Sequence, residues 1–200
     1  MAAAGEAKRL TRRGSERRRQ LLDFATERFA AEGYHATSVA EVVHGVGVGK
    51  GVFYWYFESK EALFEEILRE TQADFRRALL EAIGSEEDVV RRIELGLRAS
   101  IRWLDAHRNL LDLFQFAATE SRFAPTLHQS QERLFHELDR HIADGVDQGR
   151  LRQADPALLT QAILGVLTQL TRSFLRDDGP PADEVADAAV SFCLGGLLPR

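Results

Sequence analysis

A glycine-rich run that ends in a lysine, HGVGVGKGVFYWYF at residues 44–57, holds the residue types that phosphate chemistry uses. Glycine amides can approach phosphate oxygens closely, and a lysine supplies positive charge beside them. The Walker pattern fails, because the segment between Gly45 and Gly49 is one residue too short and no Ser or Thr follows. The dinucleotide pattern G-x-G-x-x-G also fails, because Val52 stands where its third glycine is required. The run is therefore not a nucleotide-binding loop.

Placed on a helix at about 100° per residue, the second half of the run separates into two faces. Phe53 and Phe57 fall on one stripe, which we expect to be buried. The opposite and flanking positions hold Lys50, Gly51, Tyr54 and Trp55. Lysine charge, tyrosine hydroxyls and an indole ring without any acidic neighbour are typical of a surface that approaches a DNA duplex. The alternative for Trp55 is packing against a neighbouring helix.

The surrounding residues predict helices, because apolar positions recur at spacings of three and four almost throughout the chain. We expect helices at about 15–32, from a cap at Thr37 or Ser38 to about 45, at 49–57, and from Glu58 or Ser59 to about 83. A helix, a glycine break and a second helix with an exposed polar and aromatic face form a helix-turn-helix.

The run YHATSVAEVVHGVGVGKGVFYWYFESKEALFEEIL at 34–68, preceded by RRRQLLDFATERFAAEG, resembles the DNA-binding domain of the TetR (tetracycline-repressor-like) family of transcriptional regulators. The resemblance covers about the first 70 residues. The matching motifs are F-A-x-x-G-Y at 29–34, Thr37-Ser38-Val39, Gly47-Val48, Lys50-Gly51, Phe53-Tyr54-x-Tyr56-Phe57, and Ser59-Lys60 followed by Leu63.

The resemblance implies an all-α fold with a three-helix DNA-binding domain at 15–70, in which the helix-turn-helix covers about 38–57. It implies double-stranded DNA as a partner. It places Thr37, Ser38 and Val39 where the second helix meets the DNA backbone, and Lys60 at a phosphate contact. It assigns to the recognition helix Gly49, Lys50, Gly51, Val52, Tyr54, Trp55 and Tyr56.

Two residues depart from the usual family pattern, since Gly49 stands where many relatives have Ser and Val52 where Thr is frequent. Gly51 adds a helix penalty of about 1 kcal/mol relative to Ala. We therefore expect a recognition helix that is frayed without DNA and orders on contact. Because Val52 lacks a hydroxyl, we expect it to recognise DNA through an apolar contact.

Charge is unevenly distributed, with a net of −5 for the whole chain, +3 for residues 1–60 and −8 for residues 61–200. We expect residues 1–14 to form a basic N-terminal arm that touches phosphates, the alternative being a solvated tail. The first ten residues contain no apolar core of signal-peptide length, and no stretch is apolar enough to span a membrane. A cytoplasmic location without a membrane partner is expected.

The remainder, 71–200, is expected to form a helical effector-binding and dimerisation domain. Helices are predicted at about 86–106, 110–120, 125–148, 156–176 and 182–198. The resemblance implies a small-molecule pocket among the middle helices, and an apolar or aromatic effector of unknown identity. Candidate pocket residues are Arg102, Trp103, His107, Phe114, Gln115, Glu120, Phe123 and His128.

The last two expected helices are apolar around well over half of their circumference, which is too much for a monomer surface. Small residues such as Gly195 and Gly196 permit close approach of a second helix. A homodimer is therefore expected.

No metal site and no cofactor are predicted, because no HExxH motif or cysteine pair accompanies the histidines. The leading hypothesis is a dimeric repressor that binds a palindromic operator and is released by a small-molecule effector. A constitutive DNA-binding protein without a ligand is the first alternative. An all-helical enzyme is the second, but no acid/base pair or nucleophile motif supports it.

Overall fold

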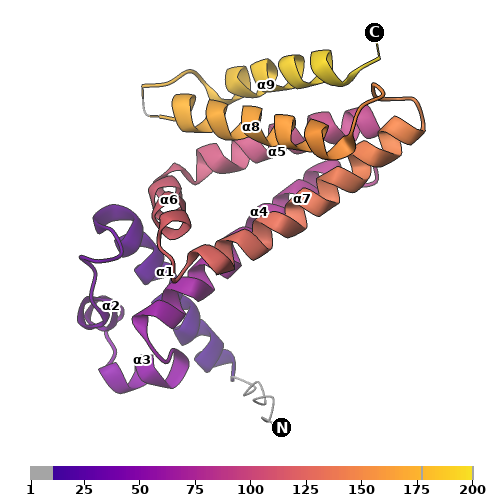
Figure 1. Cartoon of the computed structure of the whole chain (residues 1–200). Coiled ribbons are helices and arrows are strands. Elements are labelled where there is room, and N and C mark those ends of the chain that lie inside the picture. The colour runs from indigo at the N-terminus through magenta and orange to yellow at the C-terminus, as the bar shows by residue number, and fades with distance from the viewer. Residues whose placement is uncertain (1–10, 177, 200) are drawn as a thin grey trace. The chain divides into compact units, whose positions relative to one another are not determined.

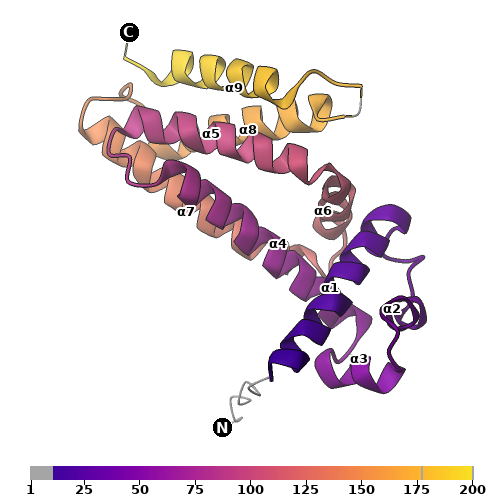
Figure 2. The same cartoon turned by 180° about the vertical axis from the view of Figure 1, so that it is seen from behind.

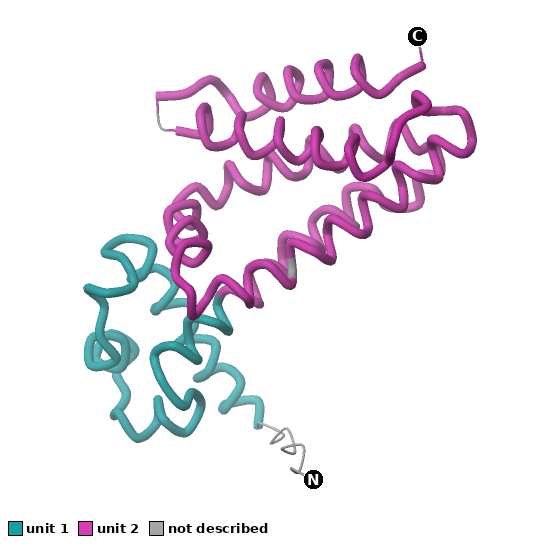
Figure 3. Tube along the Cα trace, viewed as in Figure 1, with its two compact units in different colours: residues 1–67 teal, residues 68–200 magenta. Residues whose placement is uncertain are grey.

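A computed structural model describes residues 11–176 and 178–199, and within these ranges every regular element is a helix. The all-α prediction is therefore confirmed. The chain divides into two compact units, residues 1–67 (unit 1) and residues 68–200 (unit 2), which Figure 3 shows in teal and magenta. The first ten residues, which include most of the predicted basic arm, lie outside the described residues.

Unit 1 contains α1 (Arg12–Glu32), α2 (Val39–Val46), α3 (Lys50–Tyr56) and the beginning of α4 (Lys60–Ile83), labelled in Figure 1. Helix α1 starts three residues earlier than predicted, because the hydroxyl of Thr11 caps it by accepting a hydrogen bond from the amide of Gly14. The helix ends at Gly33, whose φ of 86° disfavours a side chain. Residues 12–14, which belong to the predicted arm, are thus helical.

The core of unit 1 combines an apolar stripe of α1 with the inner faces of α2, α3 and the start of α4. Phe29, Tyr34 and Phe64 form an aromatic cluster with ring centroids 4.8–5.6 Å apart. Fully burying a side chain of this size contributes about 1.5–3 kcal/mol, so the cluster stabilises the unit substantially. The other buried apolar residues are Leu21, Leu22, Ala25, Val42, Val43, Phe53, Phe57, Leu63 and Ile67.

Unit 2 contains the rest of α4 together with α5 (Val89–Ala106), α6 (Leu111–Thr119), α7 (Ala124–Asp147), α8 (Pro156–Phe174) and α9 (Ala182–Leu197). Asp88 and Asp155 cap α5 and α8 through their carboxylates, and Pro156 occupies the first position of α8. Gly149, with a φ of 67°, turns the chain after α7. A short 3-10 turn at Arg108–Leu110 precedes α6 and was not predicted.

Helix α5 packs against α9, α8 and α7, and α8 lies between α7 and α9. Figures 1 and 2 show from opposite sides that α4 and α7 run alongside each other within this unit. The main core holds Val89, Ile93, Leu97, Ile142, Val146, Leu151, Ile163, Val190, Cys193 and Leu197. Burial raises the pKa of the Cys193 thiol, as expected for a structural cysteine.

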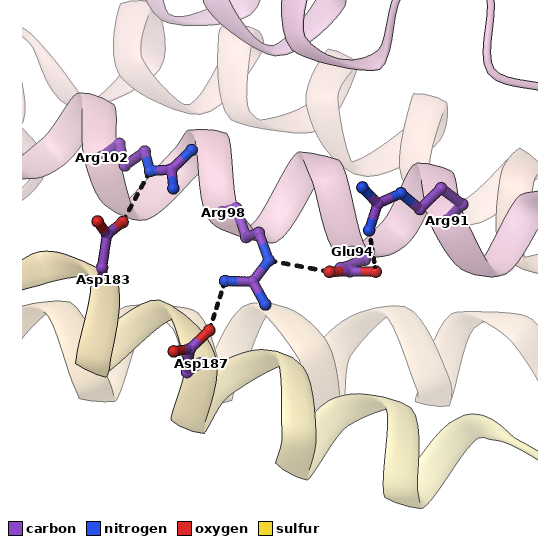
Figure 4. A network of polar contacts seen from close by, with 6 residues as sticks. All are labelled: Arg91, Glu94, Arg98, Arg102, Asp183 and Asp187. Carbon is purple, nitrogen blue, oxygen red and sulfur yellow. Dashed lines mark hydrogen bonds and ion pairs between the residues drawn. The ribbon is translucent and has the colours of Figure 1, made fainter.

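Ion pairs connect the outer edges of α5 and α9 (Figure 4). Arg98 donates to Glu94 at 2.9 Å and to Asp187 of α9 at 2.6 Å, and Arg102 donates to Asp183 of α9 at 2.8 Å. Hydrogen bonds from Arg91 and Arg98 hold the pKa of Glu94 below its ordinary value. Because Asp183 and Asp187 are exposed, each pair contributes little to stability and mainly fixes the register of the two helices.

Candidate functional site

Helices α2 and α3 are joined by a tight turn whose geometry follows from two caps. Ser38 and Glu41 form a capping box, in which the Ser38 hydroxyl accepts from the Glu41 amide at 3.2 Å and the Ser38 amide donates to the Glu41 carboxylate at 2.7 Å. Gly47 ends α2 in the left-handed region with a φ of 70°. These two caps fix where α3 begins relative to α2.

Helix α3 buries one stripe and exposes the other, as its sequence predicts. Phe53 is completely buried and Phe57 nearly so, whereas Tyr54 and Trp55 are 57% and 51% exposed. The Trp55 ring meets the half-buried Tyr56 ring edge to face at 4.5 Å. Gly49, Lys50, Gly51 and Val52 are also exposed. The predicted division of the helix into two faces is confirmed, and a DNA contact by the outer face stays a prediction.

The three residues predicted to meet the DNA backbone at α2 have different environments. Thr37 is fully buried, and its hydroxyl donates to the main-chain oxygen of Gly33 at 3.1 Å. Its side chain therefore stabilises the turn instead of facing solvent. Ser38 is exposed as the cap of α2, and Val39 is half-buried in its first turn.

Lys60, at the first position of α4, makes contacts inside unit 1. Its ammonium donates to the main-chain oxygens of Tyr34 at 2.9 Å and Thr37 at 3.0 Å, and lies 4.1 Å from the centroid of the Tyr34 ring. An ammonium has three donors, and these bonds use two of them. The predicted phosphate contact by Lys60 stays a prediction, but the lysine also has a structural role that sequence reasoning missed.

A shallow groove of about 570 Å³ lies between the first turns of α1 and the outer face of α3. Arg13 and Arg17 line it from α1, and Gly51, Val52 and Trp55 line it from α3. Arg17 also donates to Gln20 at 3.0 Å. Arg13 was predicted only as part of the basic arm, and Arg17 was not predicted as a site residue. Their spacing of four residues on a helix is the signal that places them on one face.

Unit 2 contains a partly open cavity of about 710 Å³, called here the wide cavity, between α4, α5, α6, α7 and α8. Three of the predicted pocket residues, Trp103, Phe114 and His128, line it. Sequence reasoning missed the contribution of α4 to this cavity. Gln72 of α4 lines this cavity, and its buried side-chain oxygen accepts no hydrogen bond from the described part of the chain.

The other five predicted pocket residues do not line the wide cavity. Arg102 lies on the outer edge of α5, where it pairs with Asp183. His107 stacks on Trp103 with ring centroids 4.0 Å apart, and Phe123 is buried beside Phe116. Gln115 is exposed on α6, and Glu120 is half-buried just after that helix.

A second cavity in unit 2, of about 150 Å³ and called here the narrow cavity, lies beside the wide one. Both share Phe75, Leu134, Leu164 and Leu167 in their walls. The two spaces therefore adjoin each other.

Helices α8 and α9 leave large apolar side chains in solvent. Leu158 of α8 and Phe192 of α9 are each 70% exposed. Gly165, Gly195 and Gly196 have open space where a side chain would be. Protruding side chains next to glycines are the components of a close helix–helix interface.

Two kinds of feature are absent from residues 11–176 and 178–199. No helix there is both long and apolar enough to cross a membrane. In the same ranges, no three His, Cys, Asp or Glu side chains gather in a way that could hold a metal ion.

Comparisons with known proteins cover both units. Residues 21–67 match the family described as bacterial regulatory proteins, tetR family, and residues 86–197 match the tetracyclin repressor-like C-terminal domain. The uncharacterized HTH-type transcriptional regulator YdgC of Bacillus subtilis is 28% identical over 193 residues, 94% of this chain and 96% of that protein. The HTH-type transcriptional repressor KstR2 of Rhodococcus jostii is 29% identical over 189 residues, 92% of each chain. The solved structure of the fatty acid degradation regulator FadR from Bacillus halodurans has a TM-score of 0.80 at 22% identity, covering 92% of this chain and 97% of that one.

Proposed function

This chain belongs to the TetR family of bacterial transcriptional regulators, and on that premise we propose that it is a homodimeric repressor released from a palindromic operator by an apolar effector. The observation that carries the proposal is the outer face of α3. There, Lys50, Tyr54 and Trp55 are exposed on a helix without acidic residues.

The proposed DNA contacts separate into two kinds. Lys50, Tyr54 and the exposed cap Ser38 contact phosphates, which position the protein, whereas Val52 and Trp55 lie against base edges or sugars, which carry sequence information. Gly49 and Gly51 allow the backbone to approach the duplex, because neither has a neighbour within 4 Å of where a side chain would start. Val39, Tyr56 and Lys60 complete the surface, and Thr37 contributes through its position in the turn.

Dimerisation is proposed through the exposed apolar faces of α8 and α9. Two copies of these helices would cover Leu158 and Phe192 and would use the open space at Gly165. A two-fold dimer would present two copies of α3, and such pairs read half-sites about 34 Å apart. One short helix alone gives too little affinity and specificity, so the dimer is required for operator binding.

The effector is proposed to occupy the wide cavity of unit 2, whose volume of about 710 Å³ suits a small molecule. Its aromatic and aliphatic walls favour an apolar ligand, in line with the fatty acid regulator among the similar structures. Such a cavity favours a ligand-responsive regulator over a constitutive DNA-binding protein. We also propose that the protein acts in the cytoplasm and is not an enzyme, because its relatives are transcriptional regulators.

The test is a gel-shift titration with the DNA upstream of the protein's own gene. The expected result is a discrete complex with two protomers per duplex, competed by unlabelled copies of the same DNA and not by unrelated DNA. Equal competition by unrelated DNA would contradict a sequence-specific repressor.

A further inference from the structure

Arg92 of α5 lines the narrow cavity of unit 2 and has an unsatisfied donor. Its Nη2 donates to Nε2 of His141 at 3.0 Å, but its Nε is buried and donates to no acceptor in the described part of the chain. Leaving a buried charged donor without an acceptor costs free energy. No carboxylate of the described residues forms an ion pair with Arg92.

The other charged groups in the wall of the narrow cavity already compensate one another. Arg76 donates through Nε to both carboxylate oxygens of Glu137, at 3.0 and 3.1 Å. Burial and the charge of Arg92 lower the pKa of His141, so its imidazole is neutral and accepts from Arg92. Arg92 is therefore a charged group in this wall that no carboxylate of the described residues pairs with.

Apart from Ser100, the rest of the narrow cavity is apolar, with Ile93, Leu97, Leu138 and Ile163 in its wall. On α7, the last residue that lines the narrow cavity is His141, and the first residue that lines the wide cavity is Leu127. At a rise of about 1.5 Å per residue, these two positions are about 20 Å apart along α7. The two cavities thus follow one another along α7, with a cation in the wall of the narrow cavity.

From this arrangement we propose that the effector is an apolar monocarboxylic acid whose carboxylate binds Arg92 while its apolar body occupies the wide cavity. The inference rests on the proposed effector function of unit 2 and names the class of the effector. A carboxylate would accept charge-assisted hydrogen bonds from the guanidinium of Arg92 and neutralise it. The narrow cavity, about 150 Å³, holds a carboxyl group with a few methylenes and is too small for a nucleotide.

The test compares decanoate with decanamide, its uncharged counterpart of the same shape, by calorimetric titration of the full chain. Wild-type protein should bind decanoate roughly tenfold to a hundredfold more tightly than decanamide. Arg92→Met should abolish this preference while retaining decanamide binding. Arg91→Met, on the exposed side of the same helix, should keep it and serves as the matched control.

Equal wild-type affinity for both compounds, or an undiminished preference in Arg92→Met, would overturn the inference. Retained decanamide binding shows that the Arg92→Met cavity is folded, and Arg92→Lys, which keeps the charge, should keep part of the preference. Gel shifts of the same preparations separate the two proposals. If wild-type protein binds its operator but neither compound, carboxylate recognition fails while operator binding stands.

Discussion

The ammonium of Lys60 donates a 2.9 Å hydrogen bond to the main-chain oxygen of Tyr34 and lies 4.1 Å from the centroid of the same residue's ring. A second bond reaches the main-chain oxygen of Thr37, so one side chain joins the start of α4 to the turn before α2. The position of α2 therefore depends in part on a lysine that was expected only to contact DNA.

Replacing Lys60 by Met should destabilise unit 1 by about 1–2 kcal/mol, because two main-chain acceptors lose a charged donor. Chemical denaturation followed by circular dichroism measures the effect. Lys50→Met is the matched control, since Lys50 is exposed on α3, and should leave the unfolding free energy unchanged. Equal stability of the two variants would show that the Lys60 contacts contribute nothing.

The same two lysines should differ in the salt dependence of DNA binding. Lys50→Met should reduce the slope of log affinity against log salt by about one, as for one lost phosphate contact. If Lys60 uses its third donor on a phosphate, Lys60→Met should lower the slope similarly; an unchanged slope would assign it a structural role alone.

Gly51→Ala should stabilise the free protein by up to about 1 kcal/mol, because alanine favours helix and no atom obstructs a side chain there. Hydrogen exchange of the amides from Lys50 to Tyr54 measures the change directly. Those amides should be weakly protected in the wild type and better protected in the variant. Full protection in the free wild-type protein would contradict the expected fraying of α3.

Phe192→Glu should convert the dimer to a monomer, because the substitution would bury a carboxylate in an apolar interface. Multi-angle light scattering at micromolar concentration gives the mass directly. Gln148→Glu adds the same charge at an exposed position after α7 and should remain dimeric. A wild-type monomer under these conditions would exclude the interface formed by α8 and α9.

The capping box of α2 should make stability depend on pH in the acidic range. Hydrogen bonding to the backbone amide of Ser38, and secondly to its side chain, lowers the pKa of Glu41 below its ordinary value of 4.5. The folded state therefore favours the carboxylate. Its contribution is present above the ordinary value and is lost as pH falls through the lowered one. The stability difference between wild type and Glu41→Gln should follow that course in denaturation at several pH values, and a pH-independent difference would contradict it.

The register of α3 could be predicted from the sequence because burial of Phe53 and Phe57 leaves only one orientation for Lys50 and Trp55. The start of α1 was less predictable, because the residue that caps it, Thr11, lies before the helix expected from the sequence. The contacts of Lys60 had no sequence signal, because its partners are main-chain oxygens that every residue possesses.

The pocket was harder to predict than the recognition helix, since its walls come from helices distant in the sequence. Trp103, Phe114 and His128 were found from their type and their place in the middle helices. Arg102 is on the same helix as Trp103 but pairs with α9, and only the packing of α9 decides which face of α5 is covered.

The central claim, that α3 of a dimer reads an operator, is tested most directly by fluorescence anisotropy with the DNA upstream of the protein's own gene. Wild-type protein should bind with two protomers per duplex. Trp55→Ala should weaken specific binding at least tenfold without a change in unfolding free energy, because the ring is half exposed on the outer face of α3. Unchanged affinity and sequence preference in Trp55→Ala, together with an unchanged salt slope in Lys50→Met, would contradict the assignment of α3 as the recognition helix.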